Sequence, residues 1–213
     1  MNPNLNLLIG LAMGLNLVSL GTSRLPSLIR AMSLQGVILG VMPLLMMHEL
    51  EWQVALVAAA TVAGKGLLIP ALLRRAMRAA NIDRELEPFI GFLPSLLLGA
   101  GGTIAAVALA RTLPLLPEHA GTLLVPGALA SVLTGFILLI GRTKAISQVC
   151  GYLILENGIY LFGLLIIHAI PLLVEAGFLL DVTVGVFVIG IIVDRIQRAF
   201  DSLDTRKLTI LRE

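Results

Sequence analysis

The sequence predicts an all-α, polytopic membrane protein with about seven transmembrane helices. Of its 213 residues, 58% are hydrophobic and only 13% are charged, whereas a soluble domain is nearer half apolar and a quarter charged. Apolar runs of about 20 residues, the length that crosses a bilayer as a helix, recur along the chain. Backbone groups in lipid must bond within the protein, and no alternating strand pattern appears, so these runs predict helices.

The basic residues predict the orientation, because lysine and arginine concentrate in cytoplasmic loops. With the N-terminus outside and an odd number of spans, 13 of the 15 basic residues fall in cytoplasmic segments. We therefore expect an outer N-terminus and a cytoplasmic C-terminus. The residues predicted to face the cytoplasm are Arg24, Arg30, Arg74, Arg75, Arg78, Arg84, Arg142, Lys144, Arg195, Arg198, Arg206, Lys207 and Arg212.

The apolar runs define the expected spans and their grouping. The expected spans are residues 5–21, 28–47, 52–73, 89–113, 121–141, 145–170 and 172–199. The first run lacks the basic segment of a signal peptide, so we expect it to be a retained span. A charged loop at 74–88 is the one candidate internal boundary. We interpret residues 1–113 as a four-helix membrane segment and 114–213 as a three-helix membrane segment with a cytoplasmic tail.

Four ionisable residues lie inside the apolar runs: Lys65, Glu156, Glu175 and Asp181. A charge at the centre of a span costs roughly 2.5–3.5 kcal/mol on insertion scales and therefore indicates a function. Counting about 1.5 Å per residue from the run ends places Lys65, Glu156 and Asp181 near the bilayer centre at one depth. Glu175 lies roughly two turns nearer the outer surface. We interpret the four as candidate proton- or ion-relay residues.

Other polar residues surround these acids. Residues one helical turn apart share a face of the helix, which places Tyr152 and Tyr160 beside Glu156. The other supporting polar residues are Gln148 and Asn157 in the same run and Thr183 near Asp181. Burial favours a neutral acid, and a nearby lysine favours the charged form, so a carboxyl between these influences can load and release a proton. The alternative is an ion pair, with Lys65 neutralising Glu156 or Asp181 only to hold helices together.

The remaining signals predict packing. Asn16 and Gln35 are single polar residues in apolar runs, for which we expect helix contacts. The small-residue pairs Gly10/Gly14 and Gly36/Gly40 predict close helix approach. The three histidines lack ligand spacing, so we expect no metal site. A net charge of +2 is too small to suggest nucleic acid as a partner.

The C-terminal motifs resemble known membrane subunits. Residues 121–213 resemble the small three-helix K-type subunit of respiratory complex I (NuoK) and the C-type subunit of multisubunit cation/proton antiporters. Glu156 matches a glutamate midway along that family's second helix, and Asp181, followed by Val-Thr-Val-Gly, matches one in its third helix. In this chain the second acid is an aspartate, and Glu175 is additional.

Nearly the whole chain is similar to the longer hydrogenase-4 component E family (HyfE). The matching segments are Gly-Lys65-Gly-Leu-Leu-Ile-Pro70, Glu156-Asn-Gly and Leu-Leu-Asp181-Val-Thr-Val-Gly. The resemblance implies a non-catalytic subunit of an oxidoreductase complex in the bacterial inner membrane, without a cofactor of its own. Its implied partners are antiporter-like subunits and the membrane anchor of a [NiFe]-hydrogenase module, as in formate hydrogenlyase-type complexes.

The resemblance also implies a role for the buried charges. Lys65, Glu156 and Asp181 would be links in a charged axis that couples redox energy to proton or sodium movement. Three alternatives stay open: a scaffold that docks antiporter-like subunits without conducting ions, a C-type antiporter component, and a stand-alone secondary transporter. The absence of paired inverted repeats argues mildly against the last of these.

Overall fold

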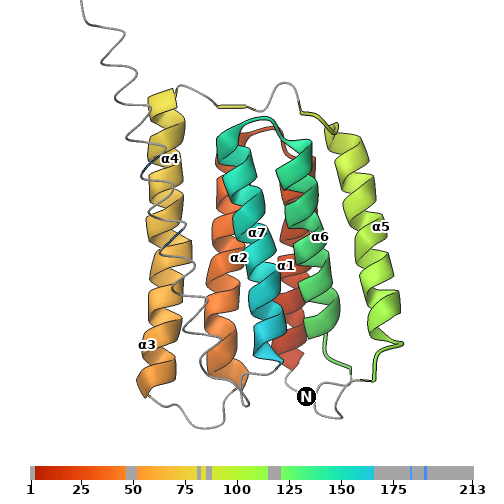
Figure 1. Cartoon of the computed structure of the whole chain (residues 1–213). Coiled ribbons are helices and arrows are strands. Elements are labelled where there is room, and N and C mark those ends of the chain that lie inside the picture. The colour runs from red at the N-terminus through yellow and green to blue at the C-terminus, as the bar shows by residue number, and fades with distance from the viewer. Residues whose placement is uncertain are drawn as a thin grey trace, which may run out of the picture.

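The chain folds into long helices joined by short connections (Figure 1). The computed structural model describes residues 3–46, 52–80, 83–84, 88–114, 121–165, 183 and 190. The helices are α1 (Pro3–Gly21), α2 (Leu25–Met46), α3 (Trp52–Thr61), the π-helix η1 (Val62–Leu68), α4 (Ile69–Ala80), α5 (Phe92–Ala110), α6 (Leu124–Gly141) and α7 (Ala145–Leu164). Among the described residues, regular structure is helical apart from one isolated bridge between Arg24 and Arg84.

Several of these helices have the length and hydropathy of membrane spans. In the described part of the chain there are five: Asn4–Gly21, Leu25–Met46, Val54–Arg78, Phe92–Ala110 and Leu124–Gly141. Helix α7 has 20 residues, but Gln148, Glu156 and Asn157 lower its mean hydropathy. The all-helical membrane class is therefore supported, while the count of seven spans stays a prediction. The expected last span, 172–199, lies outside the described residues apart from two isolated positions.

The helices form a bundle with two flanking elements (Figure 1). Helices α1, α2, α6 and α7 make the centre. The continuous rod α3–η1–α4 packs against α2 at one edge, and α5 packs against α6 and α1 at the other. Since α1 and α2 contact α6 and α7, the two predicted segments 1–113 and 114–213 share one core; their division stays a prediction.

Three predicted cytoplasmic connections meet at one end of the bundle. The Leu25 N–H donates to the Asp83 carbonyl at 3.1 Å, and the Ile90 N–H donates to the Gly141 carbonyl at 3.1 Å. Helices that alternate in direction bring these connections together, as the basic-residue pattern predicts. Which side of the membrane this end faces stays a prediction.

Arg142 joins three elements at this end. Its side chain is buried, donating from Nη1 to the Ile90 carbonyl at 3.0 Å and from Nη2 to the Leu20 carbonyl at 2.7 Å. The guanidinium also lies over the Phe92 ring, 4.4 Å from its centroid. The planar group thus supplies a donor to the Leu20 carbonyl in the last turn of α1, where helix carbonyls lack intrahelical partners, and ties it to the segment before α5.

Glycines allow the central helices to approach closely. A Cβ at Gly135 in α6 would lie 2.6 Å from the Leu155 backbone in α7. A Cβ at Gly36 in α2 would lie 2.6 Å from Lys65 Cβ, so the close approach predicted at Gly36 is confirmed. Around Gly10 and Gly14, no atom of the described residues lies within 4 Å of such a Cβ, and the expected contact is not found there.

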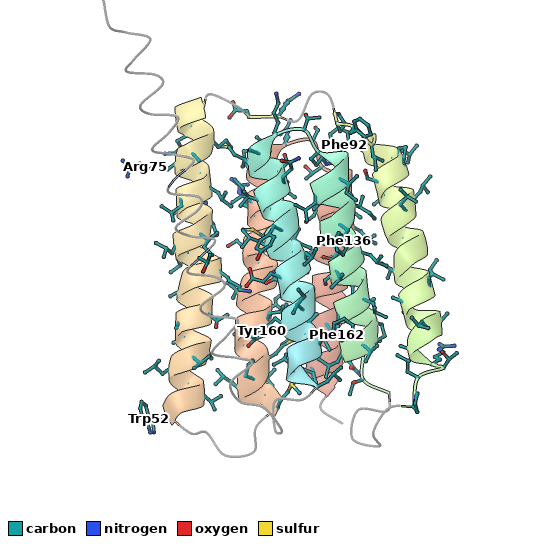
Figure 2. The ribbon with its side chains drawn as sticks, in the orientation of Figure 1. Trp52, Arg75, Phe92, Phe136, Tyr160 and Phe162 are labelled. Atoms are coloured by element: carbon teal, nitrogen blue, oxygen red, sulfur yellow. The ribbon has the colours of Figure 1, made fainter. Side chains whose placement is uncertain are left out.

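The outer surface is apolar. Large hydrophobic side chains face outward on the flanking elements, among them Leu67 at 69% exposure and Ile104 at 71%. Extended apolar surface of this kind is unusual on soluble proteins and suits contact with lipid. Trp52 projects outward from one end of the rod, and Arg75 projects outward near the other (Figure 2). These are residue types that anchor spans at the two interfaces.

Candidate functional site

The site begins with an irregular turn in the rod. In η1, the Ile69 N–H donates to the Gly64 carbonyl five residues earlier, in place of the usual four. Pro70 has no N–H to offer the preceding turn. The Gly66 carbonyl, four residues before Pro70, instead accepts a 2.9 Å hydrogen bond from Ser33 Oγ of α2. Short π-helical segments of this kind often occur at functional positions, and this one contains Lys65.

Lys65 forms a buried ion pair with Glu156. The Lys65 Nζ lies 3.1 Å from Glu156 Oε1, and the two side chains are 6% and 3% exposed. Lys65 Nζ also donates to Asn157 Oδ1 at 3.0 Å and lies 5.6 Å from the centroid of the Tyr160 ring. The pair joins the rod to α7 midway along both, which agrees with the single depth predicted for these two residues.

A chain of buried amides extends from the pair across the bundle. Asn157 Nδ2 donates to Gln35 Oε1 at 3.2 Å. Gln35 Nε2 donates to Asn16 Oδ1 at 2.9 Å and to Ser131 Oγ at 3.3 Å. Asn16 Nδ2 donates to Ser131 Oγ at 2.9 Å. Polar side chains of η1, α7, α2, α1 and α6 are thereby connected in one hydrogen-bonded network.

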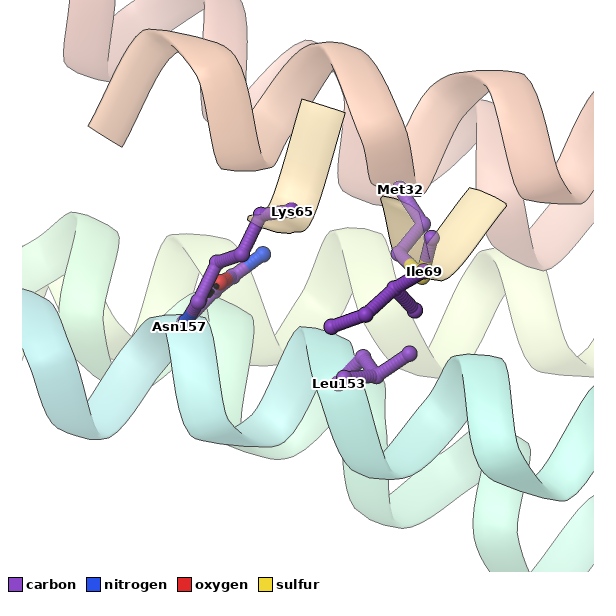
Figure 3. A pocket seen from close by; sticks show the side chains of 5 residues that line it. All are labelled: Met32, Lys65, Ile69, Leu153 and Asn157. Carbon is purple, nitrogen blue, oxygen red and sulfur yellow. Dashed lines mark hydrogen bonds between the residues drawn. The ribbon is translucent and has the colours of Figure 1, made fainter. Parts of the chain in front are cut away.

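A small cavity of about 10 Å³ adjoins Lys65 and Asn157. Figure 3 shows these two side chains on one side of it, with Met32, Ile69 and Leu153 on the other. A volume of this size is close to the minimum that holds one water molecule, and such a water needs polar partners. Lys65 and Asn157 are the polar groups in its lining.

The structure brings together only part of the predicted site. Lys65, Glu156 and Asn157 are in contact, and the Tyr160 ring lies beside them. Two predicted residues lie elsewhere: Gln148 donates to the Arg142 carbonyl at 3.0 Å, and Tyr152 is half-buried against the apolar core. Thr183 is helical and exposed. Glu175 and Asp181 lie outside the described residues.

Sequence reasoning did not connect Asn16, Gln35 and Ser131 to this site. The signal was present, because Asn16 and Gln35 each interrupt an apolar run at middle depth, as Glu156 does. Ser131 gave little signal, since single serines are common in membrane helices. Among the described residues, no three His, Cys, Asp or Glu side chains cluster as a metal ion would require.

The fold and the site define an all-helical membrane protein with an ion pair and an amide network in its core. The chain belongs to the family of the uncharacterized protein Rv0085 of Mycobacterium tuberculosis (strain ATCC 25618 / H37Rv). The two are 34% identical over 218 residues, which cover 100% of this chain and 99% of the relative.

The chain is also similar, at lower identity, to hydrogenase-4 component E of enteric bacteria. The chain is 29% identical over 152 residues to hydrogenase-4 component E of Escherichia coli (strain K12), covering 70% of this chain and 68% of the relative. Hydrogenase-4 component E of Shigella flexneri matches to the same extent. No family model and no solved structure matches the chain.

Proposed function

We propose that this protein is a membrane subunit of a hydrogenase complex and that its Lys65–Glu156 pair belongs to a proton or cation pathway. The observation that supports the pathway most directly is the pair itself, buried at 3.1 Å midway along two helices. The similarity to hydrogenase-4 component E supports membership of the complex. The expected location is the bacterial inner membrane, and the expected partners are antiporter-like and anchor subunits.

The chemistry of the pair suits a stepwise proton path. A carboxylate and an ammonium in contact can exchange a proton, so the pair has a charged and a neutral form. Their balance responds to any new charge placed nearby, because electrostatic interactions are strong away from water. A conformational or redox event in a neighbouring subunit would therefore change which group holds the proton. Asp181 and Glu175 are proposed to continue this path.

Membership of the complex is tested by purification. The tagged full-length chain is extracted from its native membrane in mild detergent, and the co-purifying proteins are identified by mass spectrometry. A [NiFe]-hydrogenase large subunit together with antiporter-like subunits is the expected result. Purification with cation/proton antiporter subunits alone, or as a single chain that transports a substrate in vesicles, would contradict it.

A scaffold is the competing role, and the ion pair on its own is compatible with it. A scaffold requires only that the chain hold its neighbours, so neutralising Asp181 would leave ion transport intact. A relay requires the acid, so Asp181→Asn would abolish ion uptake into membrane vesicles while hydrogenase activity and assembly persist. Uptake at the wild-type level in this variant would remove Asp181 from the pathway.

A further inference from the structure

The amide network extends well beyond the residues that the proposed pathway uses. Gln35, Asn16 and Ser131 are each at most 1% exposed. They belong to α2, α1 and α6, and Gln35 connects them to the pair through Asn157. Buried polar groups in a membrane helix are costly unless they are satisfied. A network of three such residues leading away from the pair therefore needs an explanation of its own.

The direction of every hydrogen bond in the network follows from the charge on Lys65. An ammonium group donates only, so Asn157 must present its oxygen to Lys65, at 3.0 Å. The Asn157 amide nitrogen is then the donor to the Gln35 oxygen. This in turn makes the Gln35 nitrogen the donor to the Asn16 oxygen and leaves the Asn16 nitrogen to donate to Ser131.

The network ends on a group that accepts twice. Ser131 Oγ receives hydrogen bonds from both Asn16 Nδ2, at 2.9 Å, and Gln35 Nε2, at 3.3 Å. A hydroxyl oxygen has two acceptor sites, so these two bonds use both. Neither Gln35 nor Asn16 can turn its amide over alone, because a nitrogen would then face the nitrogen of a neighbouring amide and a hydrogen bond would be lost.

The aligned amides act on the charge of Lys65. Each of the three turns its oxygen, the negative end of its dipole, toward the lysine side of the network. Hydrogen bonds in series polarise one another, and the effect is larger in a low-dielectric interior. The arrangement therefore turns three negative dipole ends toward the Lys65 ammonium group and holds Asn157 with its acceptor facing that group.

We infer that Gln35 and Asn16 are positioning residues, which act through Asn157 to hold Lys65 as an ammonium group against Glu156. This inference rests on the proposed function in one respect: the network would set the resting state of an ion pair that takes part in proton or cation movement. The effect of the network on the reactivity of Lys65 can be measured without any assay of ion transport.

The experiment measures the reactivity of Lys65 in the full-length chain in membranes. Acetic anhydride is small and crosses membranes, and it acetylates neutral amines, whereas an ammonium group is not nucleophilic. Mass spectrometry of the peptides gives acetylation of Lys65 relative to Lys144, a half-buried lysine outside the network. Wild-type Lys65 is expected to react little in comparison with Lys144.

Gln35→Met is the main variant, because methionine is similar in length and makes no comparable hydrogen bonds. A hydrogen bond to a charged group contributes roughly 1.5–3 kcal/mol, and Gln35 acts one bond away from Lys65, so Lys65 acetylation is expected to rise about tenfold. Gln148→Met is the matched control: the same change in a glutamine outside the network, with no expected effect on Lys65.

Two outcomes would overturn the inference: Lys65 acetylation in Gln35→Met equal to that in the wild type, or an equal rise in Gln148→Met. If Gln35→Met does not accumulate, Asn16→Leu replaces it, because it removes one of the two acceptors of Gln35 Nε2 and predicts a smaller rise in the same direction. If ion transport proves independent of Glu156 while acetylation changes as expected, the proposed function fails and the positioning role stands.

Discussion

Replacing Lys65 by methionine is the perturbation whose effect the structure sets most clearly. The variant removes the 3.1 Å contact with Glu156 and the 3.0 Å hydrogen bond to Asn157. Methionine fills much of the same apolar space, so the change is mainly one of charge. Glu156 is left at 3% exposure without its cation.

The expected destabilisation is about 3–5 kcal/mol, the usual cost of removing one partner of a buried ion pair. Protonation of Glu156 limits this cost, because a neutral acid is less costly to bury than a carboxylate. In Lys65→Met/Glu156→Met neither charge remains, and a buried pair replaced by apolar residues of similar size is often as stable as the original. The double variant should therefore regain most of the lost stability.

Thermal unfolding in detergent, followed by circular dichroism, measures both variants. For a chain of this size, 1 kcal/mol corresponds to roughly 2–4 °C, so the single variant should melt about 10 °C below the wild type. Lys144→Met is the matched control, with little change expected. Equal melting temperatures for wild type and Lys65→Met, or a double variant less stable than the single one, would refute the buried pair as described.

Two further predictions concern packing around the pair and the basic end of the bundle. Gly36→Ala should lower the free energy of unfolding by about 1–3 kcal/mol, because its Cβ would lie 2.6 Å from Lys65 Cβ. Gly10→Ala is the control with little expected effect, since no atom of the described residues lies within 4 Å of its Cβ. Equal melting temperatures for the two variants would contradict the close approach at Gly36. Arg142→Lys should lower the free energy of unfolding by about 2 kcal/mol, because an ammonium cannot reach both the Ile90 and Leu20 carbonyls and also stack on the Phe92 ring. An unchanged melting temperature would argue against this three-way contact.

Sequence reasoning was most successful where one coordinate, depth along a helix, decides the outcome. Composition and apolar runs predicted the helical class, and counting residues placed Lys65 and Glu156 at one level. Their contact also requires that both helices turn the right face toward each other. Depth along a helix does not tell which way the helix is rotated about its axis. From the sequence, the partner of Lys65 could therefore be either Glu156 or Asp181.

The amide network was missed for the same physical reason. It depends on the rotation of α1, α2, α6 and α7 about their axes, and each contributes only one or two polar groups. The π-helix was missed because Pro70 indicates an irregular turn without saying which carbonyl finds another donor. That partner, Ser33, lies on a different helix. Local patterns in one segment cannot report a contact made by another.

The central claim is that Glu156 takes part in ion movement driven by the redox reaction. The most direct test is the number of ions taken up per electron transferred, measured together in sealed membrane vesicles with Glu156→Gln. The matched control is Asp83→Asn, the same acid-to-amide change at an exposed position. We predict that hydrogenase turnover persists in Glu156→Gln while ion uptake per electron falls close to zero, and that Asp83→Asn retains both. A wild-type ratio in Glu156→Gln would contradict the account.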